Sequence, residues 1–541
     1  MDFFTLPPNV EPFTKNITDR ILSINRHDIQ NVGKVATATL AVYFVTSKLY
    51  SAFLGPLSSV PGPFQLKFYG FRYVPNIESP PGSTWEKLHM WQSKYGNVVR
   101  LGPSTIGIAD KNMLKQILST DDFPKGPAYQ RTQVGGVNVG NADDRDFHKQ
   151  RRRVISPAFS VKFVDSLERY MITSAGTLMK SVDQSIAQTQ RNDGYGKVDM
   201  WILLKRFALE IIGESLFGGQ TYRELENDSH TVNASTNGGM IGPLNYIANS
   251  PILGVLKLLL PFTGISEAYA NSSQFRDKVI LKRLQGGENA RREDILQVLI
   301  DTQNERNPED RLPIDAVVGE TMLFWTIGTE TISYVAGFAI IELLKNPQVF
   351  ATLREELDNC FITSKKESLK NGGNTLFEHE QIKHLPYLNA VIDETLRIHS
   401  GATEGLERIT DKDTVLGDRL FVPKGTILNC NMFYVQLNPD YWPEPTKFIP
   451  ERWLPDSNIP ADQEAFFPFS IGSRNCIAKQ FAMQALRLAV ANLIKFYDFE
   501  GIPEEINASN ERSCFGAILG VRSNSFKVFM KRRQATPMKT T

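Results

Sequence analysis

The sequence predicts a mainly α-helical protein with small peripheral β-sheets, preceded by an N-terminal membrane anchor. Helical periodicity dominates residues 165 to 300, and a long apolar helix is expected from about Pro313 to Leu344. Strand-like alternation is confined to short runs, and residues 97–102 with 105–109 read as a hairpin. Residues 35–54 are largely apolar and about as long as a bilayer crossing requires.

The composition is that of an ordinary globular protein with enough apolar material for a large core. The chain has 541 residues, of which 41% are hydrophobic and 22% are charged, and its formal net charge is +1. A near-neutral charge gives no argument for nucleic acid as a partner. None of the four cysteines forms a C-x-x-C pair, so neither a zinc site nor a disulfide framework is expected, and a reducing compartment fits best.

The N-terminal region divides into three predicted parts. Residues 35–54 form the expected transmembrane helix, in which Lys48 can snorkel to the interface if it lies near one end. A surface amphipathic or packed helix is the alternative. No small-residue cleavage site is evident, which favours a retained anchor. Residues 1–34 would then be lumenal, with a sequon at Asn16, and the proline-rich residues 55–65 form a hinge.

Gly-rich and Asn-rich stretches interrupt the helical pattern and are expected to be loops. The stretch from Pro124 to Phe147 reads as one long loop, of a kind that is often functional. Residues 238–264 are partly apolar and suit a substrate lid. Residues 514–519 suggest a turn between two strands, and the basic tail 533–541 is expected to be disordered.

A basic segment, residues 147–160, carries His148 and Arg152 four residues apart, so both lie on one face of a helix. A cluster of bases on a helix is ordinarily a solvated face.

The long apolar helix contains an acid and an alcohol, Glu330 and Thr331, which are costly to bury without purpose. Gly328 and the neighbouring threonines weaken the helix, so we expect a local kink that opens a groove. The ordinary alternatives are a threonine bonded back to its own helix and a salt-bridged surface acid.

A third motif pairs Glu394 with Arg397, three residues apart on one face of an amphipathic helix. Taken alone, this pair is a common surface salt bridge. Further along the chain, Arg452 lies in the segment Pro450-Glu451-Arg452-Trp453.

The fourth motif is the loop Phe469-x-x-Gly472-x-Arg474-x-Cys476, which precedes an amphipathic run from Lys479 to Leu493. Cys476 therefore lies close to a helix N-terminus, where free N–H groups and the helix dipole stabilise a thiolate. Such a thiolate is a soft metal ligand that can serve haem iron. Gly472 would supply an unusual backbone angle or a close approach to a flat cofactor, and Arg474 a donor fork for a carboxylate. A buried structural cysteine is the alternative.

Together, the four motifs resemble those of the cytochrome P450 superfamily, in the order that this family shows. The resemblance runs from about Pro61 to Arg532, and it implies the P450 fold with residues 66–532 as the haem-thiolate monooxygenase domain. It implies haem b, iron protoporphyrin IX, with Cys476 as the axial ligand of the iron. The other haem-binding positions that it implies are Arg474, Arg152, His148, Arg408, Phe469 and Gly472.

The resemblance also assigns the remaining motif residues. Glu330 and Thr331 would be catalytic and relay protons to bound oxygen, while Glu394, Arg397 and Arg452 would form a buried structural triad. The substrate pocket would include Trp325, Ile327, Ile332, Phe515 and Ile518. The chain departs from the family pattern at His148, where tryptophan is common, at Ala478, where glycine is common, and at Ile327 and Ile332, which should make the pocket tighter.

The implied activity is oxidation of a lipophilic small molecule with O2, in specialised metabolism. Electrons would come from NADPH through a separate NADPH–cytochrome P450 reductase, with cytochrome b5 as a second donor and with Lys149, Arg151 and Lys479 in the docking surface. The implied location is the endoplasmic reticulum membrane, with one N-terminal span and a cytosolic catalytic domain. The alternatives are an isomerase or dehydratase of the same fold that needs no external electrons, and a haem-binding protein without turnover.

Overall fold

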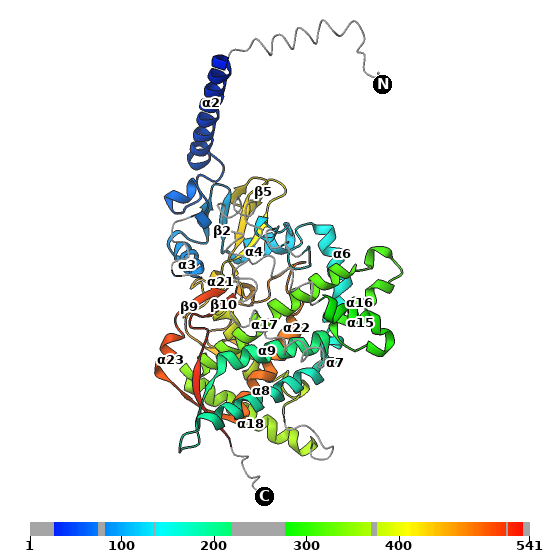
Figure 1. The fold of residues 1–541 in the computed structure, drawn as a ribbon. Helices are drawn as coiled ribbons and strands as arrows, with labels where there is room; N and C mark the ends of the chain where they lie inside the picture. The colour runs from blue at the N-terminus through cyan, green and yellow to red at the C-terminus, as the bar shows by residue number, and fades with distance from the viewer. Residues whose placement is uncertain are drawn as a thin grey trace, which may run out of the picture.

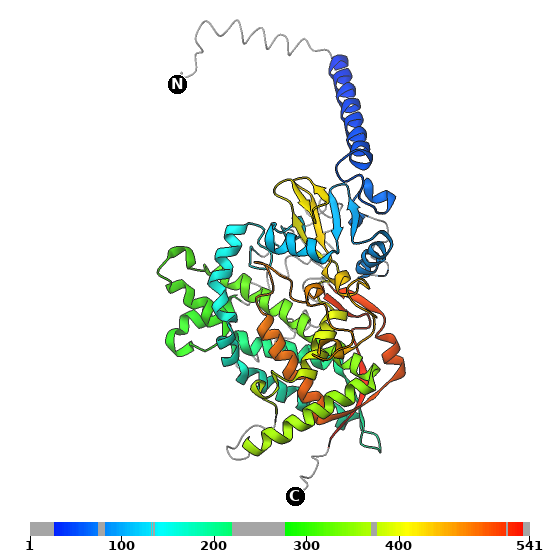
Figure 2. The same ribbon diagram turned by 180° about the vertical axis from the view of Figure 1, so that it is seen from behind.

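The computed structural model describes residues 26–73, 82–130, 136–218, 276–368, 376–515 and 518–533, together with Pro80 and Gln133. Figure 1 shows a large helical body, a smaller part rich in strands, and a single helix, α2 (Arg26–Phe53), which projects from the strand-rich end. The view from behind in Figure 2 shows the same arrangement. The mainly helical fold with small sheets is therefore confirmed.

The centre of the helical body is α17 (Ile314–Lys345), which packs against α9 (Met200–Phe217), α20 (Pro386–Ile398) and α22 (Lys479–Phe496). A helix that is apolar on all sides must be buried, and residues 332–343 of α17 are buried without exception. The predicted helix from Pro313 to Leu344 is thus confirmed.

Two glycines of α17 allow α9 to approach closely. A Cβ on Gly328 would lie 2.5 Å from Ile212 Cδ1, and a Cβ on Gly337 would lie 2.6 Å from the Trp201 ring. Residues 314–345 stay helical throughout. Gly328 therefore allows close helix packing, and the kink and groove that the sequence suggested there stay a prediction.

The other helices surround this centre or join it to the sheets. The α-helices are α3 (Thr84–Tyr95), α4 (Lys111–Lys115), α5 (Pro127–Gln130), α6 (Arg145–Ile155), α7 (Val161–Ser166), α8 (Glu168–Thr189), α15 (Lys282–Gly286), α16 (Ile295–Asp301), α18 (Pro347–Ser368), α19 (His379–Ile382), α21 (Met432–Gln436) and α23 (Pro503–Ala508). Short 3-10 or π turns are η1 (Phe64–Lys67), η2 (Phe71–Tyr73), η3 (Gln116–Thr120), η5 (Ser156–Phe159), η6 (Arg276–Leu281), η7 (Gly287–Ala290), η8 (Thr302–Asn304), η9 (Pro308–Asp310), η10 (Pro450–Trp453) and η11 (Gln463–Ala465).

The strands form small sheets. A four-stranded sheet has the order β1 (Val98–Gly102), β2 (Thr105–Ile108), β7 (Ile427–Cys430), β4 (Leu406–Ile409), and a three-stranded sheet has the order β3 (Gly196–Asp199), β11 (Lys527–Arg532), β8 (Tyr497–Gly501). Two-stranded sheets are β5 (Thr414–Leu416) with β6 (Leu420–Val422), and β9 (Arg512–Phe515) with β10 (Ile518–Val521). The predicted hairpin at residues 97–109 is confirmed as β1 and β2.

Some sequence expectations need correction. The expected loop from Pro124 to Phe147 includes α5 and the start of α6, which begins at Arg145 because the Asp144 side chain caps it by accepting from Phe147 N. Strand β3 interrupts the region that the sequence predicted as helical. The suggested lid at residues 238–264, the sequon at Asn16 and residues 534–541 of the tail lie outside the described residues.

Helix α2 is exposed to solvent over nearly all of residues 31–50, with Leu40 67% and Phe44 62% exposed. Within the part of the chain that the structure describes, one helical stretch, Pro308–Lys345, is long and apolar enough to cross a membrane. That stretch contains the buried core helix α17, so its apolar character has a packing explanation. The membrane anchor predicted at residues 35–54 therefore stays a prediction.

Candidate active site

The cysteine loop is held in shape by backbone geometry. Cys476 N donates to Phe469 O at 2.9 Å, and Gly472 has a φ of +78°. A Cβ on Gly472 would lie 1.9 Å from Leu118 O in η3. The unusual backbone angle expected for Gly472 is present, and its close approach is to the backbone of η3.

The Cys476 thiol is free and solvent-accessible, and it lies just before α22. Burial raises its pKa, whereas the Ala478 N–H, Arg152 and Lys479 all act to lower it. The thiol is thus surrounded by protein atoms and still accessible to solvent, as expected for a side chain that faces an internal cavity. The N–H group and the two cations stabilise the thiolate form that binds metals.

Four basic side chains gather near this loop: Lys125, Arg152, Arg408 and Arg474. Burial, together with the charges of Arg408, Arg474 and Arg152, lowers the pKa of Lys125 to about 7. The Nε atoms of Arg408 and Arg474 are buried without a hydrogen-bond partner. Buried guanidinium N–H groups without acceptors are costly, so this cluster fits a ligand that carries carboxylates.

His148 faces the same cluster from α6 and is buried. Burial and the charges of Arg474, Lys125, Arg152 and Arg408 lower its pKa to about 3. The imidazole is therefore neutral at physiological pH and offers one N–H donor, as an indole does.

Two of the arginines also tie the cysteine loop to its surroundings. Arg152 donates to Asn475 O at 2.6 Å and to Asn475 Oδ1 at 2.5 Å, next to the cysteine. Arg474 Nη1 donates to Ala142 O at 2.6 Å. Both side chains thus position the cysteine loop and also contribute positive charge to the basic cluster.

On α17, Glu330 is buried and Thr331 is half-buried. Burial raises the pKa of Glu330 to about 7, and the charge of Lys205 opposes this rise. Thr331 Oγ1 donates to Ile327 O at 3.0 Å, so it is bonded back to its own helix. Its lone pairs remain able to accept a hydrogen bond, and Glu330 can exchange a proton near neutral pH.

The residues suggested for the substrate pocket do not share one environment. Ile327 is 41% exposed although it lies on the core helix, so it faces open space. Trp325, Ile332 and Ile518 are instead buried in the main hydrophobic core, and Trp325 meets the Phe217 ring edge-on at 5.5 Å. For these three, neighbouring apolar side chains cover much of the surface, and their pocket-lining role stays a prediction. The Phe515 side chain lies outside the described residues.

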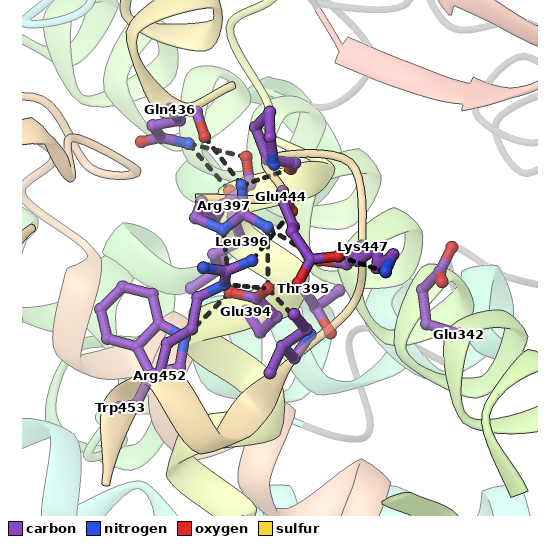
Figure 3. Close-up of polar contacts among 12 residues, drawn as sticks. Glu342, Glu394, Thr395, Leu396, Arg397, Gln436, Glu444, Lys447, Arg452 and Trp453 are labelled. Atoms are coloured by element: carbon purple, nitrogen blue, oxygen red, sulfur yellow. Dashed lines mark hydrogen bonds and ion pairs between the residues drawn. The ribbon is translucent and has the colours of Figure 1, made fainter. Parts of the chain in front are cut away.

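Behind the loop, Glu394 joins Arg397 and Arg452 in a fully buried network, which Figure 3 shows. Arg397 Nη2 donates to Glu394 Oε1 at 2.7 Å, and Arg452 Nε donates to the same oxygen at 3.3 Å. Trp453 Nε1 donates to Glu394 Oε2 at 3.0 Å. These bonds tie α20 to η10, so the network holds structure together.

Arg151 differs from the sequence-based expectation. It was suggested for a docking surface, but its guanidinium turns inward to the fully buried carboxylate of Glu320, 3.4 Å away, and lies over the Phe147 ring. Lys149 and Lys479 are exposed.

Two residues in the vicinity were missed from the sequence. Glu320 Oε1 accepts from Val139 N at 3.0 Å, and Lys125 Nζ donates to Gly140 O at 2.6 Å. These groups fix the loop before α6 from two sides. Neither belongs to a short motif, and no local pattern in the sequence marks them.

Comparison with known proteins agrees with this site. The family model described as cytochrome P450 matches residues 61–528. A cytochrome P450 monooxygenase LUC2 from a Fusarium species is 28% identical over 92% of this chain and 94% of its own length. The monooxygenase acrD of Aspergillus aculeatus is 28% identical over 86% and 93%, and averantin hydroxylase of Dothistroma septosporum is 26% identical over 85% and 84%.

The chain belongs to the cytochrome P450 family, and it is a haem-thiolate monooxygenase similar to fungal members. The residues present fit the haem that this family carries. An accessible thiol at a helix N-terminus is a suitable iron ligand, and the two unpartnered arginine Nε atoms suit the carboxylates of the porphyrin.

Proposed function

We propose that this monooxygenase oxidises a lipophilic small molecule in fungal specialised metabolism, and that it is anchored in the endoplasmic reticulum membrane by α2. The observation that carries the proposal is the accessible Cys476 thiol at the start of α22, next to a cluster of buried cations.

In this proposal, Cys476 binds the haem iron, while Arg408, Arg474, Arg152, Lys125 and His148 hold the porphyrin carboxylates. Bound haem supplies the activation of O2, which electron donation from the thiolate favours. Phe469 and Gly472 maintain the loop that presents the thiolate. The Glu394 network supports this loop and takes no part in the chemistry.

Glu330 and Thr331 are the proposed proton-handling pair. A carboxyl group whose pKa lies near neutral can both accept and release a proton at its Oε atoms. Thr331 Oγ1 can accept a hydrogen bond while it donates to Ile327 O. The two groups are adjacent in sequence on the helix that carries the exposed Ile327 side chain.

A lipophilic substrate is supported by that exposed isoleucine, on a helix in which apolar residues predominate. The role in specialised metabolism is supported by the relatives, one of which is named for the hydroxylation of averantin.

The proposed electron source is NADPH, through a membrane-bound NADPH–cytochrome P450 reductase, with cytochrome b5 as an accessory donor. The cations proposed for docking are two exposed lysines, Lys149 on α6 and Lys479 at the start of α22, just after the cysteine loop. Arg151 is left out of this docking surface because its guanidinium is paired with the buried Glu320 carboxyl group.

The proposed anchor rests on the length and exposure of α2. Its 28 residues span about 42 Å at 1.5 Å per residue, which exceeds the roughly 30 Å hydrocarbon core. Lys48 lies near the domain end of the helix, where a lysine can reach the interface. The catalytic domain would then face the cytosol.

The proposal is tested by supplying the full chain, in membranes with a fungal reductase, with NADPH, isotopically labelled O2 and a panel of lipophilic fungal metabolites. The expected result is a product that carries one labelled oxygen atom and that is absent when Cys476→Ala replaces the wild type. NADPH-independent conversion without label would contradict the proposal and favour isomerase or dehydratase chemistry.

A further inference from the structure

Lys205 is a buried lysine on α9 that no part of the proposed mechanism uses. It is 7% exposed, and its Nζ donates to Asn524 Oδ1 at 2.6 Å. Its ammonium group also lies over the Tyr334 ring, 5.1 Å from the centroid. A buried lysine requires such partners, because an isolated ammonium in a protein core is strongly unfavourable.

The position of Lys205 is fixed by the elements around it. Trp201, one turn earlier on α9, stacks on the Tyr334 ring with centroids 5.1 Å apart and donates from Nε1 to Asn524 Oδ1 at 3.3 Å. A Cβ on Gly520 of β10 would lie 3.0 Å from the Tyr334 ring. Lys205 is thus enclosed by α9, α17 and the turn between β10 and β11.

Glu330 lies one turn before Tyr334 on α17, so it shares this side of the helix. Its Oε2 is buried without a hydrogen-bond partner. Lys205 is the cation whose charge acts on this carboxyl, against the effect of burial. Tyr334 on α17 and Cys514 on β9 are the other titratable groups named on this side among the described residues. Burial and the charges of Glu330 and Cys514 raise the pKa of Tyr334, so the phenol is neutral at physiological pH.

We propose that Lys205 is a positioning residue for Glu330: held in place by Asn524, its ammonium group keeps the Glu330 carboxyl able to lose its proton inside the core. This rests on the proposed function only for its catalytic meaning, since the coupling itself is a property of the folded chain. Without Lys205, Glu330 would hold its proton through the physiological range and could no longer pass it on. Asn524, in a turn with a φ of +52°, is the lysine's fixed support.

The test is an infrared titration of the full-length protein, in which the carboxylic acid band of Glu330 is identified by its loss in Glu330→Gln. Lys205→Met keeps the length of the apolar stem and removes the charge. We expect the midpoint of the Glu330 titration to rise by about one pH unit or more, the usual effect of removing a nearby opposite charge. Lys205→Arg should stay close to the wild type.

The matched control is Arg206→Met, which removes an exposed charge from the next position of the same helix and should leave the midpoint unchanged. An unchanged midpoint in Lys205→Met would overturn the proposal. If Lys205→Met does not fold, Asn524→Ala serves in its place, with a smaller upward shift expected and no shift counting against the proposal.

A second readout separates this inference from the proposed function. The ratio of product formed to NADPH consumed should rise with pH through the midpoint of the Glu330 titration, and Lys205→Met should move that rise to higher pH. If the infrared midpoint moves while this ratio stays the same, Lys205 and Glu330 are coupled but Glu330 handles no catalytic proton.

Discussion

Replacing Glu394 by glutamine tests the buried network behind the cysteine loop (Figure 3). The Glu394 carboxylate is fully buried and accepts from Arg397 Nε at 2.8 Å, Arg397 Nη2 at 2.7 Å, Arg452 Nε at 3.3 Å, Trp453 Nε1 at 3.0 Å and Ile449 N at 3.0 Å. Glu394→Gln removes the negative charge and leaves two buried guanidinium groups without a counter-ion.

The expected loss of unfolding free energy depends on the hydrogen bonds that each arginine keeps in the variant. Arg397 still donates to three backbone carbonyls, those of Gln436, Pro445 and Lys447, whereas Arg452 keeps Glu444 O and has an Nη1 that is already unpartnered. Breaking a buried ion pair from one side costs about 3–5 kcal/mol, and we expect a loss of unfolding free energy of at least about 3 kcal/mol. That is a large share of the stability of a typical domain, which is about 5–15 kcal/mol.

The assay is urea unfolding followed by near-ultraviolet circular dichroism, with haem content measured on the same samples. Glu380→Gln is the matched control, because Glu380 pairs with Lys383 at the same spacing of three residues but is 77% exposed at its side chain. The control should unfold like the wild type. If Glu394→Gln unfolds within about 1 kcal/mol of the wild type, the reasoning about this network is refuted.

Three further predictions concern the loop and its supports. Gly472→Ala should lower the unfolding free energy by more than about 2 kcal/mol and reduce haem content, because φ is +78° and the new Cβ would meet Leu118 O; wild-type melting and haem content would contradict this. Lys125→Met should speed haem loss to a competing apoprotein about tenfold, since a charge-assisted bond is removed; an unchanged rate would exclude Lys125 from the porphyrin site. Glu320→Gln should flatten the dependence of stability on pH. The pKa of Glu320 is about 7 in the folded state and 4.5 in the unfolded state. As pH rises from about 4.5 to about 7, the unfolding free energy of the wild type should therefore fall by up to about 3 kcal/mol relative to that of the variant. Parallel pH profiles would show that Glu320 does not titrate in this range.

Local patterns predicted much of the fold. The core helix α17, the β1–β2 hairpin and the helix that begins after Cys476 follow from apolar periodicity and from turn residues close in sequence. The pairing of β7 with β2 in parallel joins residues more than three hundred positions apart, and no periodicity reports such a register.

The candidate site was predictable in its motifs and less so in its contacts. Short motifs located Cys476, Arg474 and Glu330, because their spacing is fixed within a few residues. Lys125 and Glu320 could not be found in this way, because each bonds to the backbone of the loop before α6 only in the folded chain. Trp325 and Ile332 lie in the hydrophobic core, and helical periodicity alone does not say which apolar face of a helix meets a core and which meets a pocket.

The most direct test of the central claim is the carbon monoxide difference spectrum of the reduced full-length protein, recorded beside that of Cys476→Ala. The account predicts a Soret band at the red-shifted position typical of thiolate ligation in the wild type, and its loss in the variant. A band typical of histidine ligation, or the same spectrum in both proteins, would contradict the assignment of Cys476 as the iron ligand.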